Sequence, residues 1–289
     1  MNNSPLVSIT MPVYNGAKTL AAAMQSIVTQ SFPDWELLVI DDASTDDSVA
    51  IAKRFNDPRI RVIENVKNEG LAAKLNQGID LSNGQFFARM DQDDLAFPDR
   101  LAKQVAYLQA HPTTDLVAAR AVIFTSAGEA LGLLPYHATH AEICARPWSG
   151  FYMPHPTWMG RLAWFKQHHY RIPEVVRGED QELLLRTYDQ SEFACLPDVL
   201  LAYRLDEISW RKTRSGRLNL LPWFWRAHFA RGRYGYAVMS VAGILLKLVI
   251  EFGALKFGSH DRLRELRTRE MDADALRQWQ AVWQAYGNL

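Results

Sequence analysis

Apolar runs and amphipathic segments alternate along the first hundred residues. Four short runs rich in Val, Ile, Leu or Phe are predicted as strands, at 6–12, 34–44, 59–65 and 84–91. Three segments with apolar residues at helical spacing are predicted as helices, at 16–31, 46–56 and 70–82. This alternation with short connections predicts an α/β fold, in which helices cover both faces of a parallel sheet.

The alternation is less regular after residue 100. The pattern predicts a helix over 99–112 that Asp99 caps, and either Ser44 or Asp46 is expected to cap the helix over 46–56. A strand and turn over 115–129 and a helix over 179–190 follow. The aromatic, proline-containing segment 150–161 is expected to form a wall or lid rather than a regular element.

The segment 219–258 mixes aromatic residues, arginines and a long apolar stretch. Its charge-free part runs from Ala237 to Leu246, after which Lys247 and Glu251 follow at helical spacing. A membrane-spanning helix needs about 20 mostly apolar residues, and this stretch is shorter. We therefore expect a helix that lies in a membrane interface. The alternative is an ordinary helix packed on the rest of the protein.

Charge is distributed unevenly along the chain, although the formal net charge is zero. Residues 1–203 carry 17 basic and 24 acidic side chains, a balance of −7, whereas residues 204–289 carry 15 and 8, a balance of +7. A basic C-terminal region suggests an anionic partner such as a membrane surface or nucleic acid, or docking on the protein's own acidic part.

The cysteines and the N-terminus bear on location. Cys144 and Cys195 are the only cysteines, and they form no CxxC pair. Two free thiols in a reducing compartment are expected. The first residues lack a basic segment followed by an apolar stretch, so no signal peptide is predicted. Both observations favour a cytoplasmic location.

Polar clusters follow three predicted strands, at Pro12–Asn15, Asp41–Asp46 and Asp91–Asp94. Ligands of open parallel sheets bind beyond the carboxyl ends of the strands. Side chains alternate along extended backbone, so Asp91 and Asp93 should point the same way. Two carboxylates together suit Mg²⁺ or Mn²⁺, and Mg²⁺ is usually shared with substrate phosphates. The pattern predicts a metal and a phosphorylated ligand; the alternative is a solvated acidic loop.

The stretch "VSITMPVYNGAKTLAAAMQSIVTQSFPDWELLVIDDASTDDS", then "NEGLAAKLNQGI", then "MDQDDLAFPDRL", resembles the family 2 inverting glycosyltransferases of GT-A fold. The match covers 6–103 and resumes around 179–204. It implies a Rossmann-like, mostly parallel sheet in a catalytic domain over 1–210, with a nucleotide-sugar half (1–103) and an acceptor half (104–210). Residues 211–289 would be a basic, aromatic, helical extension.

The resemblance also implies a donor site. Tyr14 would lie against the base, Asp42, or else Asp41, would contact the uracil edge, and Asp93 would bind the metal. Asp91 would reach the ribose or the metal, while Asp94 supports the loop. Lys74 stands where the family usually has arginine, and lysine lacks the bidentate geometry of arginine. The remaining residues implied to line the nucleotide-sugar site are Pro12, Val13, Asn15, Gly70 and Arg204.

On the acceptor side, "RGEDQELLLR" resembles the family segment whose aspartate is the catalytic base. That role falls on Asp180, with Glu179 as the lesser candidate. Asp206 occupies a position where the family usually has histidine. Three residues of the aromatic segment are candidates for a platform under an acceptor sugar: Tyr152, His155 and Trp158. His155 has the alternative of a purely structural role.

The resulting hypothesis is a metal-dependent inverting glycosyltransferase of cell-surface polysaccharide synthesis. It would move a sugar from a nucleotide-diphosphate sugar, UDP favoured, to a hydroxyl of a glycan or lipid-linked acceptor. It would lie on the cytoplasmic face of the inner membrane and bind no nucleic acid. A sugar nucleotidyltransferase is the first alternative, although "MPVYNGAKT" has only one glycine. A non-catalytic nucleotide-sugar-binding protein is the second, although such a protein would not need Asp180.

Overall fold

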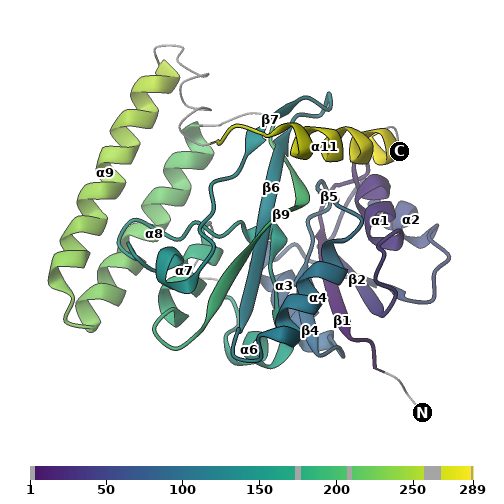
Figure 1. Ribbon diagram of the computed structural model, residues 1–289, viewed down its shortest axis with the longest axis horizontal. Helices are drawn as coiled ribbons and strands as arrows, with labels where there is room; N and C mark the ends of the chain where they lie inside the picture. The colour runs from purple at the N-terminus through teal and green to yellow at the C-terminus, as the bar shows by residue number, and fades with distance from the viewer. Residues whose placement is uncertain (1–3, 173–176, 207–209, 257–267, 288) are drawn as a thin grey trace.

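The computed structural model describes residues 4–172, 177–206, 210–256, 268–287 and 289 (Figure 1). Its centre is a nine-stranded sheet in the order β3-β2-β1-β4-β8-β6-β9-β5, with β7 paired to β6. The strands are β1 Val7–Val13, β2 Trp35–Asp41, β3 Ile60–Glu64, β4 Phe86–Arg89, β5 Leu95–Ala96, β6 Leu116–Phe124, β7 Ala130–Leu133, β8 Met159–Arg161 and β9 Phe193–Arg204. The α/β fold predicted from the sequence is confirmed.

Helices connect the strands. They are α1 Leu20–Val28, α2 Ser48–Lys53, α3 Leu71–Leu81, α4 Arg100–Ala110, α5 His140–Ile143, α6 Leu162–Gln167, α7 Glu179–Thr187, α8 Trp210–Ala230, α9 Tyr234–Lys256 and α11 Ala273–Tyr286, with a 3₁₀ turn η1 at His155–Thr157. Every strand and helix predicted up to residue 112 is present, with ends that differ by a few residues. The short elements β5, β7, β8, α5 and α6 were not predicted.

Parallel pairing places the ends of the N-terminal strands together. β1 pairs in parallel with both β2 and β4, and Val13 lies opposite Asp41. The second half of the sheet differs: β8 runs antiparallel to β4 and β6, while β6 and β9 are parallel. The polar residues that follow β1, β2 and β4 therefore meet at one edge of the sheet.

Alternation along the strands divides the core into two faces. Val7, Ile9 and Met11 of β1 pack in a cluster with apolar residues of α1 and α4. On the other face, Phe87 of β4 packs with Leu75 of α3 and with residues of α6 and α7. Helices thus cover both faces, because each strand presents apolar side chains alternately to each side.

The predicted caps differ in detail. α2 begins after Asp47, one residue later than expected, and the Asp46 carboxylate accepts the Ser48 amide at 3.0 Å. Asp99 does precede α4, but its carboxylate accepts the Ser31 hydroxyl at 2.8 Å rather than a helix amide. Asp99 therefore links the start of α4 to the segment after α1 by a hydrogen bond. Both cysteines are free, as expected.

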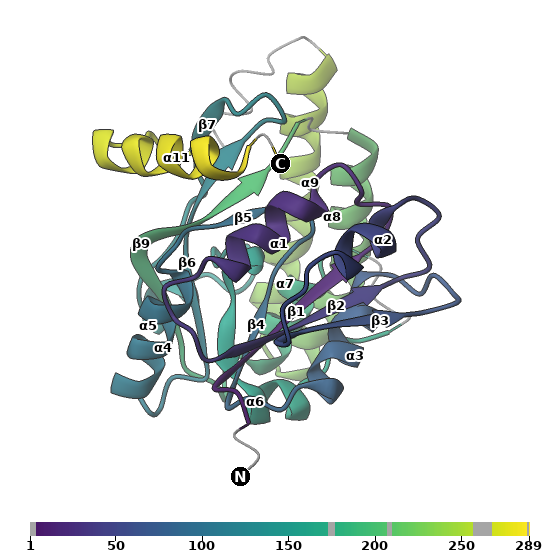
Figure 2. The same cartoon turned by 90° about the vertical axis from the view of Figure 1, so that its right-hand side faces the viewer.

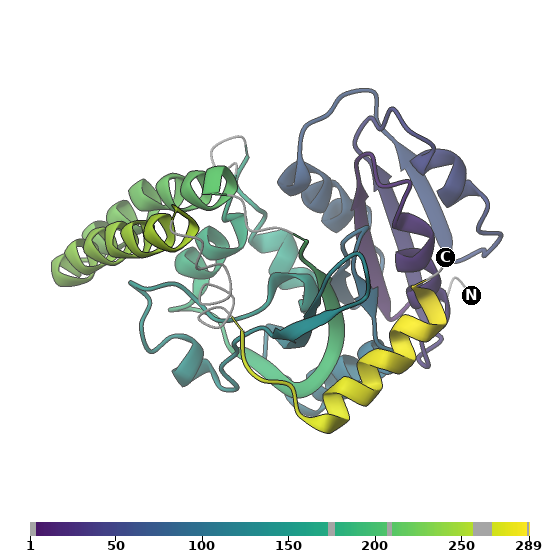
Figure 3. The ribbon, with the colours of Figure 1, turned by 90° about the horizontal axis from the view of Figure 1, so that it is seen from above.

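The helices α8 and α9 form a hairpin that projects from the sheet (Figure 3). α9 contains one candidate membrane span, Tyr234–Ala254, of 21 residues with mean hydropathy 1.9; only 17% of its most apolar stretch is buried in the structure. The expectation that this stretch is too short to span is therefore wrong in length and composition. The reason is that Lys247 and Glu251 interrupt the apolar stretch without lowering its mean hydropathy enough to exclude a span. In the structure Lys247 donates to the Ser149 carbonyl at 2.8 Å, and Glu251 pairs with Arg217 of α8.

The chain returns from the hairpin to the body of the protein. α11 lies beside α1 and the edge of the sheet (Figure 2). Trp279 is buried against Phe124 of β6 at 4.6 Å between ring centroids, and the Tyr286 hydroxyl lies 2.7 Å from that of Thr29. The C-terminal region therefore contains a projecting hairpin and a docked helix. The predicted domain boundary near residue 210 stays a prediction.

Candidate functional site

The loops after β1 and β4 are joined directly. Gln92, between the two aspartates of the "DQD" sequence, accepts the Tyr14 amide at 2.8 Å and donates to the Tyr14 carbonyl at 3.1 Å. Tyr14 itself is 47% exposed, so its ring is accessible to a ligand. Pro12 and Val13 are buried in β1. The side-chain oxygen of Asn15, whose φ is +50°, accepts the Thr45 amide at 2.8 Å. These hydrogen bonds fix the conformation of the loop after β1.

The acidic pair after β2 is buried, and its two members have different partners. Both Asp42 oxygens accept backbone amides, from Glu69 and from Gly70, each at 2.8 Å. Among the described residues, the two oxygens of the Asp41 carboxylate share a single donor, the Ser44 amide, at 3.1 and 3.3 Å. Asp42 thus holds the loop before α3. Because Asp41 has one donor and Asp42 has two, the geometry leaves Asp41 the freer carboxylate to accept from a base.

Lys74 of α3 is buried beneath this loop. Its ammonium lies 2.9 Å from Glu69 and 3.5 Å from Asp42. Gly70, which precedes α3, has φ of +90°, a conformation that L side chains rarely adopt. Two carboxylates therefore neutralise the buried ammonium of Lys74, and its contact with a diphosphate stays a prediction.

A buried arginine stands opposite the acidic cluster. Arg89, the last residue of β4, pairs with Asp91 through its guanidinium. Arg100 of α4 is also fully buried and supports this strand end by donating to the Arg89 carbonyl at 2.7 Å. The acidic loop therefore has a protein counter-charge in addition to any metal ion.

The other two aspartates of the cluster are less well compensated. Burial, and then the charge of Asp91, raise the pKa of Asp93 to about 6. Asp94 is fully buried, and one carboxylate oxygen accepts the Arg204 amide at 3.0 Å, while the other has no hydrogen-bond partner in the described part of the chain. Asp94 therefore ties the loop to the end of β9, in the supporting role expected of it.

Arg204 lies beside the same loop. Its Nε donates to the Asp93 carbonyl at 2.9 Å, and its guanidinium lies over the Phe124 ring. Asp206, in the place of the family's histidine, accepts the Ser126 amide at 2.5 Å and hydroxyl at 2.7 Å. Asp206 thus fixes the turn before β7, while Arg204 remains close to the acidic loop.

The residues present fit a divalent cation at Asp91 and Asp93. Both offer carboxylate oxygens, the ligands that Mg²⁺ and Mn²⁺ prefer. Burial and the neighbouring Asp91 both oppose the charged form of Asp93, and a bound cation would favour it. Such a cation would supply charge stabilisation to a diphosphate bound beside it.

A second acidic group begins at the N-terminus of α7. His155, Glu179 and Asp180 offer ligand atoms that all lie within 4.8 Å of one another. The Glu179 side chain is only 13% exposed, and its Oε1 lies 3.8 Å from Nδ1 of His155. Burial, and then the charge of Arg89, lower the pKa of His155 well below its usual value. His155 is therefore neutral, and its Nε2 lies 2.8 Å from the Tyr170 hydroxyl.

The charge of Arg89 acts on both acidic groups. The Arg89 guanidinium pairs with Asp91. Its positive charge lowers the pKa of His155 and partly offsets the increase in the pKa of Glu179. Hydrogen bonds place the same elements together: Arg100 donates to the carbonyls of Arg89 and Pro156, at 2.7 and 3.1 Å, and His155 lies next to Pro156. The loop after β4 and the start of α7 therefore face one common site, although about ninety residues separate them in the chain.

The predicted acceptor residues differ in how accessible their side chains are. Tyr152 is 44% exposed and lines a cavity with His155 and Asp180. Trp158 is fully buried, and its Nε1 donates to the Met153 carbonyl at 3.2 Å. The prediction of a sugar platform at Trp158 is thus wrong, because packing against His155 leaves no face of the indole accessible.

Sequence reasoning missed four residues that organise the site: Arg89, Gln92, Arg100 and Tyr170. Arg89 and Arg100 flank the acidic motif, and an arginine at the end of an apolar strand was an available signal. Gln92 and Tyr170 carried no such signal, because their roles depend on partners from distant parts of the chain.

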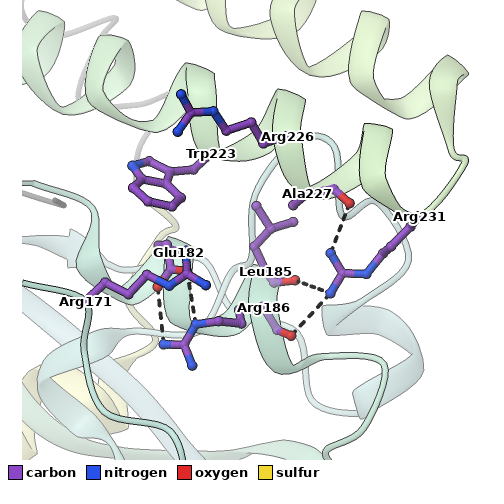
Figure 4. Close-up of a pocket in the computed structure, with 8 residues that line it drawn as sticks. All are labelled: Arg171, Glu182, Leu185, Arg186, Trp223, Arg226, Ala227 and Arg231. Carbon is purple, nitrogen blue, oxygen red and sulfur yellow. Dashed lines mark hydrogen bonds and ion pairs between the residues drawn. The ribbon is translucent and has the colours of Figure 1, made fainter.

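A basic pocket lies where α8 docks on α7 (Figure 4). Glu182 of α7 is buried between Arg171, at 3.2 Å, and Arg186, at 3.1 Å. Arg231, directly after α8, donates to the carbonyls of Leu185 and Arg186. These bonds attach the hairpin to the helix that carries Asp180, so the position of α8 is coupled to the acceptor side.

Replacing Glu179 with Gln should change how thermal stability depends on pH. Burial, and then the charge of Asp180, raise the pKa of Glu179 from 4.5 to about 7. The folded protein thus holds this proton more tightly, so the free energy of unfolding of the wild type falls as pH rises from about 4.5 through about 7. The free energy of unfolding of Glu179→Gln lacks that pH-dependent decrease. The difference in Tm between the variant and the wild type should therefore be more positive at pH 8 than at pH 5.

Thermal unfolding at the two pH values measures this difference. The exposed Glu129→Gln is the control, and its Tm relative to wild type should not depend on pH in this way. An equal offset for Glu179→Gln at pH 5 and pH 8 would contradict the burial of its carboxyl group.

Comparisons with known proteins agree with this geometry. EpsE of Bacillus subtilis (strain 168), whose name describes a glycosyltransferase, is 36% identical over 195 residues, which cover 66% of this chain and 69% of EpsE. The UDP-Glc:alpha-D-GlcNAc-diphosphoundecaprenol beta-1,3-glucosyltransferase WfgD of Escherichia coli is 36% identical over 103 residues, 36% of this chain and 41% of WfgD.

A solved structure supports the fold. The mannosyltransferase PcManGT of Pyrobaculum calidifontis, in complex with GDP-Man and Mn²⁺, superposes with a TM-score of 0.59 at 17% identity, covering 99% of this chain and 86% of that one. The GT-A type of fold expected from the sequence is thereby confirmed. The model of the family described as glycosyl transferase family 2 matches residues 8–168. The chain belongs to glycosyl transferase family 2.

Proposed function

We propose that the protein is a metal-dependent, inverting glycosyltransferase that uses a nucleotide-diphosphate sugar. The observation that carries this proposal is that two acidic groups lie on either side of one strand end: Arg89 pairs with Asp91, and Arg100 joins the Arg89 carbonyl to the segment whose His155 lies with Glu179 and Asp180. One group suits a metal and a diphosphate, and the other suits a proton acceptor. A site that only binds nucleotide sugars has no need of the second.

The donor would lie across the carboxyl ends of β1, β2 and β4. The exposed Tyr14 ring would lie against the base, and Asp41 would accept from its edge. Arg204 and Lys74 would approach the diphosphate from opposite sides of the site. WfgD is named for UDP-Glc and PcManGT was solved with GDP-Man and Mn²⁺; with the acidic loop these support a nucleotide-sugar donor, and we favour UDP.

Asp180 would act as the base. An acceptor hydroxyl is a poor nucleophile, so a carboxylate must take its proton as the oxygen attacks the anomeric carbon. The bond from that carbon to the diphosphate breaks on the opposite face, and its electron pair leaves with the nucleoside diphosphate. A single displacement inverts the configuration. Asp180 sits in the first turn of α7, where the helix dipole favours a carboxylate in its charged form.

The acceptor and the location follow from the surroundings of Asp180. We propose that the enzyme contributes to cell-surface polysaccharide synthesis at the cytoplasmic face of the inner membrane, held there by the α8–α9 hairpin. The exposed apolar side chains of α9, which include Val238, Leu245, Leu246 and Val249, support this attachment. No nucleic acid partner is needed. The sugar nucleotidyltransferase alternative remains disfavoured, because the loop after β1 contains only Gly16.

A donor screen tests the proposal. Thermal unfolding in Mn²⁺ with UDP-, GDP- and dTDP-sugars should identify one donor that raises Tm and whose effect EDTA removes. Transfer of that sugar to an acceptor, with the anomeric configuration read by NMR, should show inversion. A retained configuration, or stabilisation unaffected by EDTA, would reject this mechanism.

A further inference from the structure

We propose that the cavity beneath the α8–α9 hairpin holds the lipid part of a phosphate-linked lipid acceptor, with Lys247 contacting the phosphate. This inference rests on the proposed transferase function and specifies its acceptor. The argument has three parts: the apolar lining of the cavity, its opening toward Asp180, and the cations in its wall.

The cavity has a volume of about 820 Å³ and lies between the hairpin and the segment 148–155. Its wall includes apolar side chains from three parts of the chain, among them Trp148, Phe151, Leu220, Phe224, Met239 and Ile244. Ligand pockets commonly have volumes of about 300–1,000 Å³ and predominantly apolar linings. Free sugars present hydroxyl groups throughout and would leave this apolar wall unsatisfied, whereas a hydrocarbon chain would fill it.

The same cavity reaches the proposed base. Asp180, Gln181 and His155 belong to its wall together with the apolar residues. Gln181 donates to the Asp180 carboxylate at 3.1 Å and to the Phe151 carbonyl at 3.1 Å, which joins the polar end to the apolar segment. One molecule could therefore place an apolar chain in the cavity and a sugar hydroxyl at Asp180.

Two cationic side chains, Arg217 and Lys247, belong to the wall of the same cavity. Lys247 of α9 donates to the carbonyl and hydroxyl of Ser149, at 2.8 and 3.2 Å, and Arg217 of α8 pairs with Glu251. Burial, and then the charge of Arg217, lower the pKa of Lys247. An anion bound here would offset that effect, because it favours the charged ammonium. A phosphate between lipid and sugar has the matching charge.

The position of α9 explains how such a lipid would arrive. One face of α9 lines the cavity through Met239, Gly243 and Lys247, while another exposes Leu245, Leu246 and Val249. A helix that presents apolar residues outward and a cavity inward is suited to take up a ligand from a membrane. A soluble acceptor would not require this arrangement.

The experiment compares two added phenylalanines on α9. Gly243 lines the cavity, and Gly235 is exposed outside it; a Cβ at either position meets no atom within 4 Å. The affinity of the full chain for farnesyl diphosphate is measured by calorimetry in detergent. It should fall at least tenfold in Gly243→Phe, fall about tenfold in Lys247→Met and stay unchanged in Gly235→Phe. Farnesol should bind the wild type at least tenfold more weakly than farnesyl diphosphate.

Equal binding by the wild type and Gly243→Phe would overturn the proposed cavity. Equal binding of farnesol and farnesyl diphosphate would overturn the phosphate contact. Inorganic diphosphate that competes as well as farnesyl diphosphate would show that the cavity takes no lipid. Donor binding in Mn²⁺, measured on the same variants, should stay unchanged. Its absence in the wild type would refute the transferase function instead, so the two failures are distinguishable.

Discussion

Asp180→Asn should reduce sugar transfer by about 10²–10⁴-fold, the usual contribution of a positioned general base. The amide has nearly the shape of the carboxylate but takes no proton. Its neighbour Gln181 can still bond to the amide oxygen, so the start of α7 should keep its conformation. The Kd for the nucleotide sugar in Mn²⁺ should therefore change little. Steady-state transfer and equilibrium donor binding, measured side by side, check this split.

The control for this variant is Asp198→Asn. Asp198 pairs with Lys103 on the surface, and its loss should affect neither transfer nor binding. If Asp180→Asn weakened donor binding as much as transfer, Asp180 would be a donor-binding or structural residue. If transfer persisted at the wild-type rate, the base would be another group, with Glu179 the first to test.

Asp93→Ala should have the opposite effect, because it acts on the donor. Loss of one of two carboxylate ligands should weaken donor binding in Mn²⁺ by about 100-fold, which corresponds to about 2.7 kcal/mol. Without metal the same change should not lower Tm, since it removes a half-buried carboxyl whose ionisation is opposed by desolvation and then by the charge of Asp91. Donor titrations with Mn²⁺ and with EDTA, together with metal-free thermal unfolding, test both statements.

Asp99→Ala is the matched control, because Asp99 follows the same loop but its carboxylate bonds only to Ser31 among the described residues. Its donor affinity should equal that of the wild type with and without metal. If Asp93→Ala bound the donor normally in Mn²⁺, the metal would belong elsewhere. The group formed by His155, Glu179 and Asp180 would then be the next candidate.

The N-terminal half of the fold could be predicted from sequence because its strands and helices carry strong local patterns. The run at 6–12 and the polar "YN" after it define both a buried strand and its ligand-facing end. The second half could not be predicted as well. Its strands β7 and β8 are three or four residues long, too short for alternation to be visible. The long strand β9 was also not predicted, because Pro197 and Asp198 interrupt its apolar pattern.

The candidate site divides in the same way. Asp91, Asp93 and Asp180 stood out because acidic residues at a strand end or helix start are conspicuous in a sequence. The role of Trp158 was mistaken because burial depends on neighbours that the local pattern does not reveal. Arg89 was missed although it lies next to the acidic motif, since its importance comes from facing α7 across the site.

The return of the chain to the body through α11 determines how the hairpin can be studied. Arg269 exchanges two backbone hydrogen bonds with Leu133, at 2.8 and 2.9 Å, and Trp279 donates to the Gly128 carbonyl at 3.2 Å. A protein truncated within α8 would lose these hydrogen bonds and α11 as well as α9, and would expose Phe124 to solvent. Poor solubility of such a truncation would say nothing about lipids. Internal excision of α8 and α9, with α11 retained, separates membrane attachment from the integrity of the sheet edge.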